Sequence, residues 1–122
     1  MSVRSLDGKK CLITGAGSGI GRATALRASE VGAELFLTDI NSVGLEETVA
    51  MVGAGGGTVS MAKALDISDY DEVVKFGTEI HTQFSSMDVV MNIAGISAWG
   101  TIENLEHRHW KSMVDVNLMG PI

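Results

Sequence analysis

The hydrophobic residues of this chain fall into four short runs that are separated by longer segments of mixed polarity. The runs cover residues 10–14, 34–39, 58–65 and 87–92. The mixed segments, with apolar side chains at helical spacing, cover residues 19–31, 42–52, 70–84 and 105–118. Short apolar runs are typical of strands that are buried on both faces of a sheet. The alternation of strands and helices predicts an α/β fold, a doubly wound parallel sheet with helices on both faces.

Small and polar residues mark where the predicted helices begin and end. Gly32 follows the first helix and supplies its C-terminal stop. Asn41 or Ser42 can cap the second helix, because a short polar side chain can accept a hydrogen bond from the first turn. Ser68, followed three residues later by Asp71, is a variant of the capping box and predicts the start of the third helix.

The spacing of apolar residues also predicts which face of each helix packs against the sheet. The candidates are Ile20, Ala23, Thr24 and Leu26 in the first helix, Val43, Leu45, Val49 and Val52 in the second, and Val73, Val74, Phe76, Ile80 and Phe84 in the third. Cys11 lies inside the first apolar run, where core packing is expected rather than a reactive thiol.

Length and composition fit one globular domain over residues 1–122. Of these residues, 45% are hydrophobic and 20% are charged. The net charge is −6 and no segment gathers Lys and Arg, which argues against nucleic acid or an anionic membrane surface as a partner. No apolar run approaches the ~20 residues of a membrane span, and the N-terminus lacks the apolar core of a signal peptide. With a single cysteine as well, a cytoplasmic protein is expected.

A glycine or a polar residue follows each of the four predicted strands. Gly15, Asp39, Asp66 and Asn92 occupy these positions, at intervals of 24, 27 and 26 residues. Because the carboxyl ends of parallel strands meet at one edge of a sheet, these residues are expected to lie close together. The sequence therefore predicts a ligand site at this edge.

The turn after the first strand alternates glycine with other small or apolar residues. Gly15 permits a tight turn, Gly19 lets a diphosphate approach the backbone, and Gly21 lets the following helix pack closely on the sheet. Ser18 and Ile20 lie in the same turn and belong to the candidate site. The N–H groups and the partial positive charge of the helix N-terminus favour a diphosphate there.

The acidic residue at the end of the second strand bears on the choice of cofactor. Asp39 lies 18 residues after Gly21, near the ~20 expected of a carboxylate that accepts both hydroxyls of an adenosine ribose. A 2′-phosphate ~4 Å from this carboxylate would cost roughly 4 kcal/mol at an effective dielectric constant of ~20. Residues 40–42 offer no cation to offset that repulsion, and Arg22 is expected to point along the first helix. The sequence therefore predicts NAD rather than NADP.

Three of these polar residues also have purely structural interpretations. Asp39 could be a helix-capping or turn carboxylate, and Asn92 could be a turn amide. Asp66 could cap the helix that begins near Ser68, whereas the functional interpretation places it at the edge of an adenine.

Five motifs occur in a fixed order along the chain. They are residues 14–21 (TGAGSGIG), Asp39, Asp66 with Ile67, residues 92–95 (NIAG) and residues 116–118 (VNL). Together they resemble the short-chain dehydrogenases/reductases, over a stretch from about Gly8 to the last residue. The resemblance implies a Rossmann fold and a nicotinamide cofactor, with the adenine near Asp39, Ile40, Asp66 and Ile67 and the nicotinamide-side ribose near Asn92, Ala94 and Gly95. Ile93 departs from the family pattern, which most often has a second Asn at this position.

The same resemblance implies a catalytic role and an oligomeric state. Asn117 corresponds to the family's helix asparagine, which holds a water in the proton relay behind the catalytic lysine. The alternative for Asn117 is an amide without such a role. The helix from residue 105 corresponds to an interface element of the family, so a homodimer or homotetramer is expected.

The family's remaining catalytic residues are missing from this sequence. Its chemistry uses a tyrosine, a lysine four residues later and a serine, but Tyr70 is the only tyrosine and Val74 stands four positions on. We therefore expect residues 1–122 to be the N-terminal part of a longer single-domain enzyme, in which the fourth strand lacks one neighbour and has an unpaired edge. That enzyme is expected to transfer a hydride between NAD and a small alcohol or carbonyl substrate, and residues 1–122 alone are expected to be inactive. The alternative is a catalytically inactive dinucleotide-binding regulator or a truncated product.

Overall fold

A single four-stranded parallel sheet forms the centre of the computed structural model, which describes residues 5–122. The strands are β1 (Lys10–Thr14), β2 (Glu34–Asp39), β3 (Thr58–Ala64) and β4 (Val89–Met91), and their order in the sheet is β3-β2-β1-β4. The chain adds β2 and β3 on one side of β1 and then returns to place β4 on the other side. The direction of winding therefore reverses between β1 and β4.

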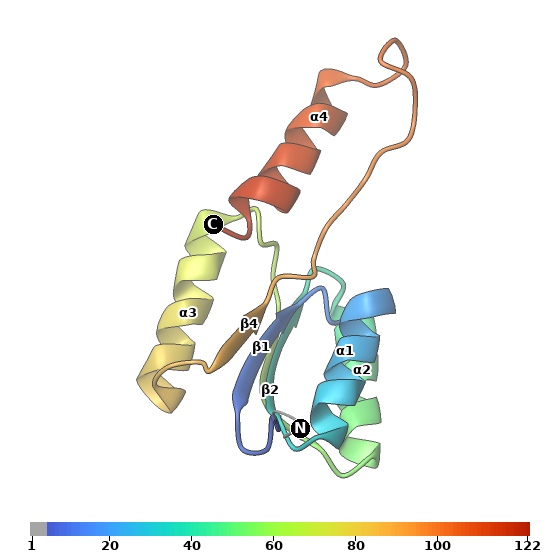
Figure 1. The fold of residues 1–122 in the computed structure, drawn as a ribbon. Helices are drawn as coiled ribbons and strands as arrows, with labels where there is room; N and C mark the ends of the chain where they lie inside the picture. Colours follow the sequence, from blue (N-terminus) through green and yellow to red (C-terminus); the bar gives the residue numbers. More distant parts are fainter. Residues whose placement is uncertain (1–4) are drawn as a thin grey trace.

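Helices cover both faces of this sheet. They are α1 (Gly19–Glu30), α2 (Ser42–Ala54) and α3 (Tyr70–Phe84). After β4 comes α4 (His107–Val114), which lies outside these two layers and continues as a short π-helix, η1 (Asp115–Met119). The helices α1 and α2 lie together on one face, and α3 lies on the other (Figure 1). The predicted doubly wound α/β fold is confirmed, although β4 is shorter than the apolar run over residues 87–92.

Side-chain alternation along β2 supplies one hydrophobic core on each face of the sheet. Leu35 and Leu37 pack in the cluster beneath α1 and α2, whereas Phe36 packs in the cluster beneath α3. The Phe36 ring meets the ring of Phe84 edge-to-face, with centroids 5.0 Å apart. Because β2 is an interior strand, its side chains are buried on both faces, which explains its continuous apolar run.

The helix α1 packs mainly through its smallest residues, and of the face expected from its apolar spacing Leu26 packs against the core. Gly21, Ala25 and Ala28 are its buried residues, whereas Ile20 is 76% exposed and Ala23 is exposed. Small side chains bring the helix axis close to the sheet, and a large residue has no room on that face. In the other helices, the exposed Val43 and Val74 were also wrong as inward-facing candidates, whereas Leu45, Val52, Phe76 and Ile80 are buried as expected.

The start of α3 differs from the predicted capping box. Asp69 is the N-cap, and its side chain accepts a hydrogen bond from the backbone N–H of Glu72. The Ser68 hydroxyl instead donates to the side chain of Asp66, so the proposed pairing of Ser68 with Asp71 was wrong. At α2, the choice between two candidates is settled, because Asn41 Oδ1 accepts from the N–H of Gly44 at 3.0 Å.

Cys11 is fully buried in β1. Burial, and in second place the negative charge of Asp88, raise the pKa of its thiol. The thiol therefore stays protonated at neutral pH, as expected for a residue that packs in the core.

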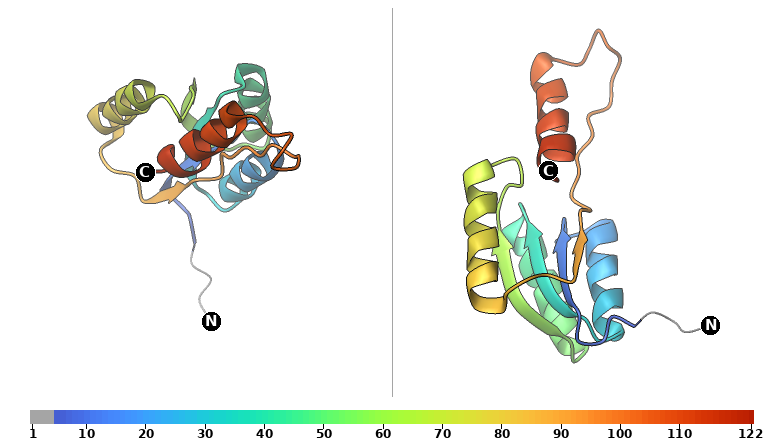
Figure 2. Two further views of the ribbon diagram at one scale, coloured as in Figure 1. Left: turned by 90° about the horizontal axis from the view of Figure 1, so that it is seen from above. Right: turned by 60° about the vertical axis from the view of Figure 1, so that its left-hand side comes forward.

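The C-terminal part stands beyond the carboxyl ends of the strands (Figure 2). The helix α4 has no buried residue, and β4 pairs with β1 alone among the described strands, so its outer edge is open as expected. None of the helices within residues 5–122 combines the length and apolar character that crossing a membrane would require.

Candidate functional site

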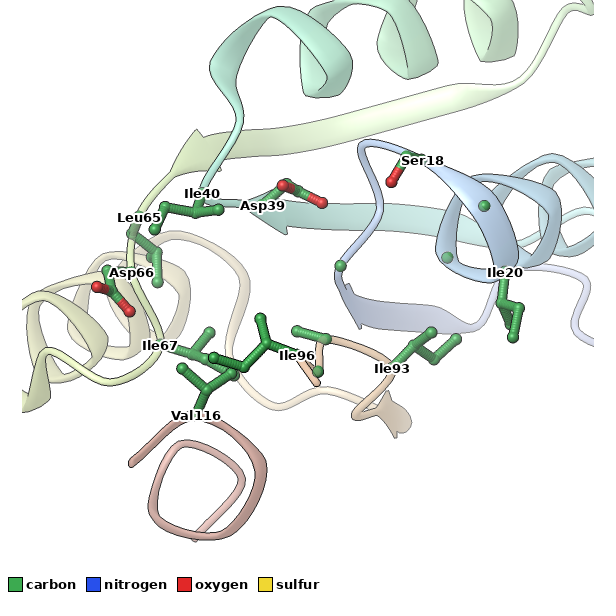
Figure 3. A pocket seen from close by; sticks show the side chains of 15 residues that line it. Ser18, Ile20, Asp39, Ile40, Leu65, Asp66, Ile67, Ile93, Ile96 and Val116 are labelled. Atoms are coloured by element: carbon green, nitrogen blue, oxygen red, sulfur yellow. The ribbon is translucent and has the colours of Figure 1, made fainter. Parts of the chain in front are cut away.

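A cavity of about 350 Å³ lies at the carboxyl ends of the strands, where the winding of the sheet reverses. Its lining comes from the turn after β1, the end of β2, the segment after β3, the segment after β4, and η1 (Figure 3). Open parallel sheets bind their ligands at this place, because the loops on either side of the reversal leave a crevice between them. The lining residues are Gly15, Ser18, Gly19, Ile20, Gly21, Asp39, Ile40, Leu65, Asp66, Ile67, Ile93, Ala94, Gly95, Ile96 and Val116.

Eleven of the twelve candidate cofactor-binding residues from the sequence line this one cavity. The twelfth, Asn92, is exposed and is not part of the lining. Four lining residues were not among the candidates, and all four are apolar: Leu65, Ile93, Ile96 and Val116. Ile93 and Val116 lie within the motifs, and Leu65 and Ile96 are chain neighbours of motif residues. This position in or beside a motif is the signal that could have found them.

The glycines of the turn after β1 serve two separate purposes. Gly15 has a φ of +67°, and a Cβ there would lie 2.8 Å from backbone atoms of Ala94. A Cβ on Gly21 would lie 1.9 Å from the carbonyl oxygen of Gly15. By contrast, Gly19 has a φ of +51° and nothing within 4 Å of an added Cβ. Two glycines therefore permit close packing of backbone, and the third keeps the mouth of the turn open.

The open turn leads into the N-terminus of α1. The N-cap residue Ser18 makes no side-chain hydrogen bond to the first turn of the helix within the described chain. The N–H groups of that turn remain available to a ligand, and together with the helix dipole they favour a negatively charged group such as a phosphate.

The carboxylate of Asp39 is held from two sides by backbone N–H groups. Its Oδ2 accepts from Gly17 and its Oδ1 accepts from Asn41, both at 2.8 Å. The bond from Asn41 is the local turn that the structural interpretation of Asp39 anticipated, yet the residue also lines the cavity. Each carboxylate oxygen can accept more than one hydrogen bond, so Asp39 can still accept from neighbouring hydroxyl groups of a ligand.

The carboxylate of the second acidic residue of the cavity accepts hydrogen bonds only from its own loop within the described chain. Asp66 Oδ1 accepts from the backbone N–H and the hydroxyl of Ser68, at 2.9 and 2.6 Å. The helix-cap interpretation of Asp66 is wrong, because Asp69 caps α3.

A threonine at the end of β1 fixes the segment that follows β4. The Thr14 hydroxyl accepts hydrogen bonds from the N–H groups of Ile93 and Ala94, at 3.0 and 3.1 Å. These residues come after the last paired residue of β4, where no neighbouring strand could satisfy them. Thr14 therefore places one wall of the cavity against the glycine turn.

Asn117 lies in the π-helix and joins it to the same segment. Its Oδ1 accepts from the N–H of Ile96 and its Nδ2 donates to the carbonyl of Ile96, both at 2.8 Å. Gly120, just after η1, allows a close approach to Ile67. A Cβ added to Gly120 would lie 2.8 Å from the Ile67 side chain. Ile67, Ile96 and Val116 consequently gather on one side of the cavity (Figure 3). The role of Asn117 in a proton relay stays a prediction.

The comparisons with known proteins agree on the class of this chain. The family model for short chain dehydrogenase matches residues 9–122. A 3-oxoacyl-[acyl-carrier-protein] reductase, FabG of Thermotoga maritima, is 33% identical over 115 residues, which are 94% of this chain and 46% of that protein. A short chain dehydrogenase/reductase from Burkholderia phymatum in complex with NAD superposes with a TM-score of 0.90 at 32% identity, covering 98% of this chain and 42% of that one.

A metagenomic short-chain oxidoreductase in complex with NADP is similar to the same extent. Its TM-score is 0.88 at 30% identity, over 95% of this chain and 52% of that one. The chain thus belongs to the short chain dehydrogenase family of oxidoreductases, as the motifs indicated. It spans about half the length, or less, of these three relatives.

Proposed function

We propose that this chain is the cofactor-binding part of an NAD-dependent oxidoreductase that transfers a hydride between the nicotinamide and an alcohol or carbonyl substrate. The observation that carries the choice of NAD is the charge of the cavity. Two of its lining residues, Asp39 and Asp66, are acidic and none of them is basic. An additional phosphate on the adenosine ribose would meet Asp39 without a cation to offset it.

Each part of the lining suits one part of such a cofactor. Asp39 would accept hydrogen bonds from the ribose hydroxyls, and the N–H groups at the start of α1 would hold the diphosphate. Ile40 and Ile67 offer apolar surface to the adenine, with Asp66 at its edge. The nicotinamide half would lie toward Ala94 and its neighbours Gly95 and Ile96. Once bound, the nicotinamide supplies the hydride chemistry, and these residues orient it and exclude water.

The proton chemistry of the reaction is assigned to sequence outside residues 1–122. Tyr70, the only tyrosine, is 78% exposed at the start of α3 and has Val74 four residues on. We propose that a serine, a tyrosine and a lysine beyond Ile122 complete the active site, with Asn117 supporting the lysine through a bound water. We also propose that the protein forms a homodimer or homotetramer. A cytoplasmic location is proposed because a lone buried cysteine fits a reducing compartment.

The full-length protein is expected to bind NADH more than about tenfold more tightly than NADPH. Even half of the roughly 4 kcal/mol between two charges at ~4 Å exceeds a factor of ten. Titration with each dinucleotide, followed by cofactor fluorescence, measures both dissociation constants. Comparable affinity, or comparable kcat/KM with the two cofactors, would contradict the assignment of NAD.

Residues 1–122 alone are expected to bind NADH without turning over any alcohol or carbonyl compound. Hydride transfer needs an acid/base group beside the reacting carbon, and this chain has no Tyr-x-x-x-Lys pair to provide it. The measurement is the absorbance of NADH over a panel of alcohols and ketones, with the full-length protein as the positive control. Turnover by the 122-residue chain would refute the proposal, and binding without turnover by the full-length protein would indicate a regulator instead.

A further inference from the structure

The guanidinium of Arg22 bridges the glycine turn and the helix α2. Arg22 lies in the first turn of α1, and its side chain is 26% exposed. Its Nη2 donates to the carbonyl oxygens of Gly17 and Gly44, at 2.6 and 3.1 Å, and pairs with Glu47 at 2.8 Å. Its Nε donates to the hydroxyl of Thr48 at 3.0 Å. One side chain thus contacts four acceptors on two separate segments.

Thr48 extends this network to the next residue of the turn. It is fully buried, and its hydroxyl accepts from Arg22 and donates to the carbonyl of Ala16 at 2.8 Å. Arg22 and Thr48 therefore hold the consecutive carbonyl groups of Ala16 and Gly17. A buried carbonyl without a partner costs free energy, so both bonds favour one conformation of the turn.

The segment held in this way is the one that holds Asp39. The N–H of Gly17 donates to Asp39 Oδ2, and an added Cβ on Gly17 would lie 2.8 Å from Asp39 Cγ. On its other side, the carbonyl of Gly17 approaches Gly44 so closely that a Cβ there would lie 2.6 Å away. The turn is packed between Asp39 and the first turn of α2, and it cannot move without breaking one of these contacts.

Arg22 is the nearby cation that the sequence offers for a 2′-phosphate, and its side chain points to α2 rather than along α1 as expected. It is not among the residues that line the cavity. Its Nη2 already serves two carbonyl groups and a carboxylate, and the pairing with Glu47 offsets its charge. A ligand phosphate that bound through Nε or Nη2 would displace these acceptors and so release the turn.

We propose that Arg22 is a positioning residue for cofactor discrimination. Together with Thr48 it fixes Gly17, and through Gly17 it keeps the Asp39 carboxylate from turning away from the adenosine ribose. The ribose hydroxyls of NAD then find the Asp39 carboxylate already in place as an acceptor. The 2′-phosphate of NADP is repelled by the same carboxylate, which cannot move away. This inference rests on the proposed function, because it concerns how the site prefers NAD.

The test is the ratio of dissociation constants for NADPH and NADH in Arg22→Met of the full-length protein. With the turn released, Asp39 becomes mobile, so we expect NADH to bind about tenfold more weakly and NADPH no more weakly than in the wild type. The ratio falls accordingly. If Arg22 instead served the 2′-phosphate, its removal would weaken NADPH more than NADH and the ratio would rise. A ratio that rises or stays unchanged overturns the proposal.

Arg27→Met is the matched control. Arg27 lies on the same helix, and its one partner among residues 5–122 is Glu30, in an ion pair whose side chains are 74% and 63% exposed. The same loss of charge and of a guanidinium at this position should leave the ratio unchanged. If the ratio fell equally in Arg27→Met, the effect would come from net charge alone, and the proposal would also be overturned.

Two further variants keep the test informative if Arg22→Met fails to fold. Arg22→Lys keeps the charge but replaces the planar fork of donors by a single ammonium group, and Thr48→Val removes the hydroxyl while keeping the shape. Both are expected to lower the ratio, and a ratio unmoved in both overturns the proposal. If the wild-type protein prefers NADPH, the proposed NAD dependence is wrong. If the wild-type protein prefers NADH and none of these variants changes that preference, only the proposed role of Arg22 is wrong.

Discussion

Gly21→Ala is expected to destabilise the chain by about 3 kcal/mol or more, because the added methyl group would collide with backbone. The new Cβ would lie 1.9 Å from the carbonyl oxygen of Gly15 and 2.5 Å from its carbon. Gly15 cannot retreat, since it is itself packed against the backbone of Ala94. The helix α1 would have to move off the sheet, and the buried contacts of Ala25 and Ala28 would be lost with it. Urea-induced unfolding measures the free energy of unfolding.

Gly77→Ala makes the same chemical change inside another helix, where the expected result has the opposite sign. Nothing lies within 4 Å of a Cβ added to Gly77, which is inside α3. Alanine in a helix interior is about 0.5–1 kcal/mol more favourable than glycine, so this variant should be more stable than the wild type. If both variants changed the free energy of unfolding equally, the close approach of α1 to the glycine turn would not be the reason that position 21 requires glycine.

The order of the elements could be predicted because each of them has a local signal. The strands β1 and β2 and the helix α3 have the bounds that the sequence indicated. A continuous apolar run such as residues 34–39 and the polar residues that precede Tyr70 depend on a few neighbouring side chains only. Elements with such signals can be predicted because local preference and tertiary packing favour the same secondary structure there.

The packing of α1 could not be predicted, because it depends on residues far apart in the sequence. A hydrophobicity pattern selects Ile20 and Ala23, which are exposed, whereas the structure buries Gly21 and Ala25, which allow the helix to approach the sheet. The contacts of Arg22 with α2 were missed for the same reason. A sequence shows which side chain can donate hydrogen bonds, but it does not show which acceptors another helix brings within reach.

The candidate site could also be predicted only in part, for the residues whose position follows from a local signal. Residues at strand ends, such as Asp39 and Asp66, could be placed together because parallel strands end at a common edge. Asn92 was expected in the same cavity and lies outside its lining. Ile96 and Val116 enter the lining instead, because Asn117 ties η1 to the segment after β4. That contact joins two irregular segments, for which periodicity carries no information.

Asp39→Asn is expected to lower the preference of the full-length protein for NADH over NADPH by about thirtyfold, which corresponds to half of the roughly 4 kcal/mol of repulsion at ~4 Å. Two effects act in the same direction. The loss of charge removes the repulsion of a 2′-phosphate. Gly17 and Asn41 donate to different oxygens of Asp39, and in the amide one of these two positions becomes an NH2 group that cannot accept. The group that receives the ribose hydroxyls is then no longer held from two sides.

Asp66→Asn separates this effect from a general change in the charge of the cavity. Asp66 is the other carboxylate in the lining, but it accepts only from Ser68 and is proposed to lie at the adenine rather than at the ribose. The two variants lose the same charge from the same cavity, so paired titrations with NADH and NADPH compare position alone. We expect the preference in Asp66→Asn to stay within about threefold of the wild type, which is under 1 kcal/mol. Equal losses of preference would mean that the summed negative charge, rather than a carboxylate fixed beside the ribose, selects the cofactor.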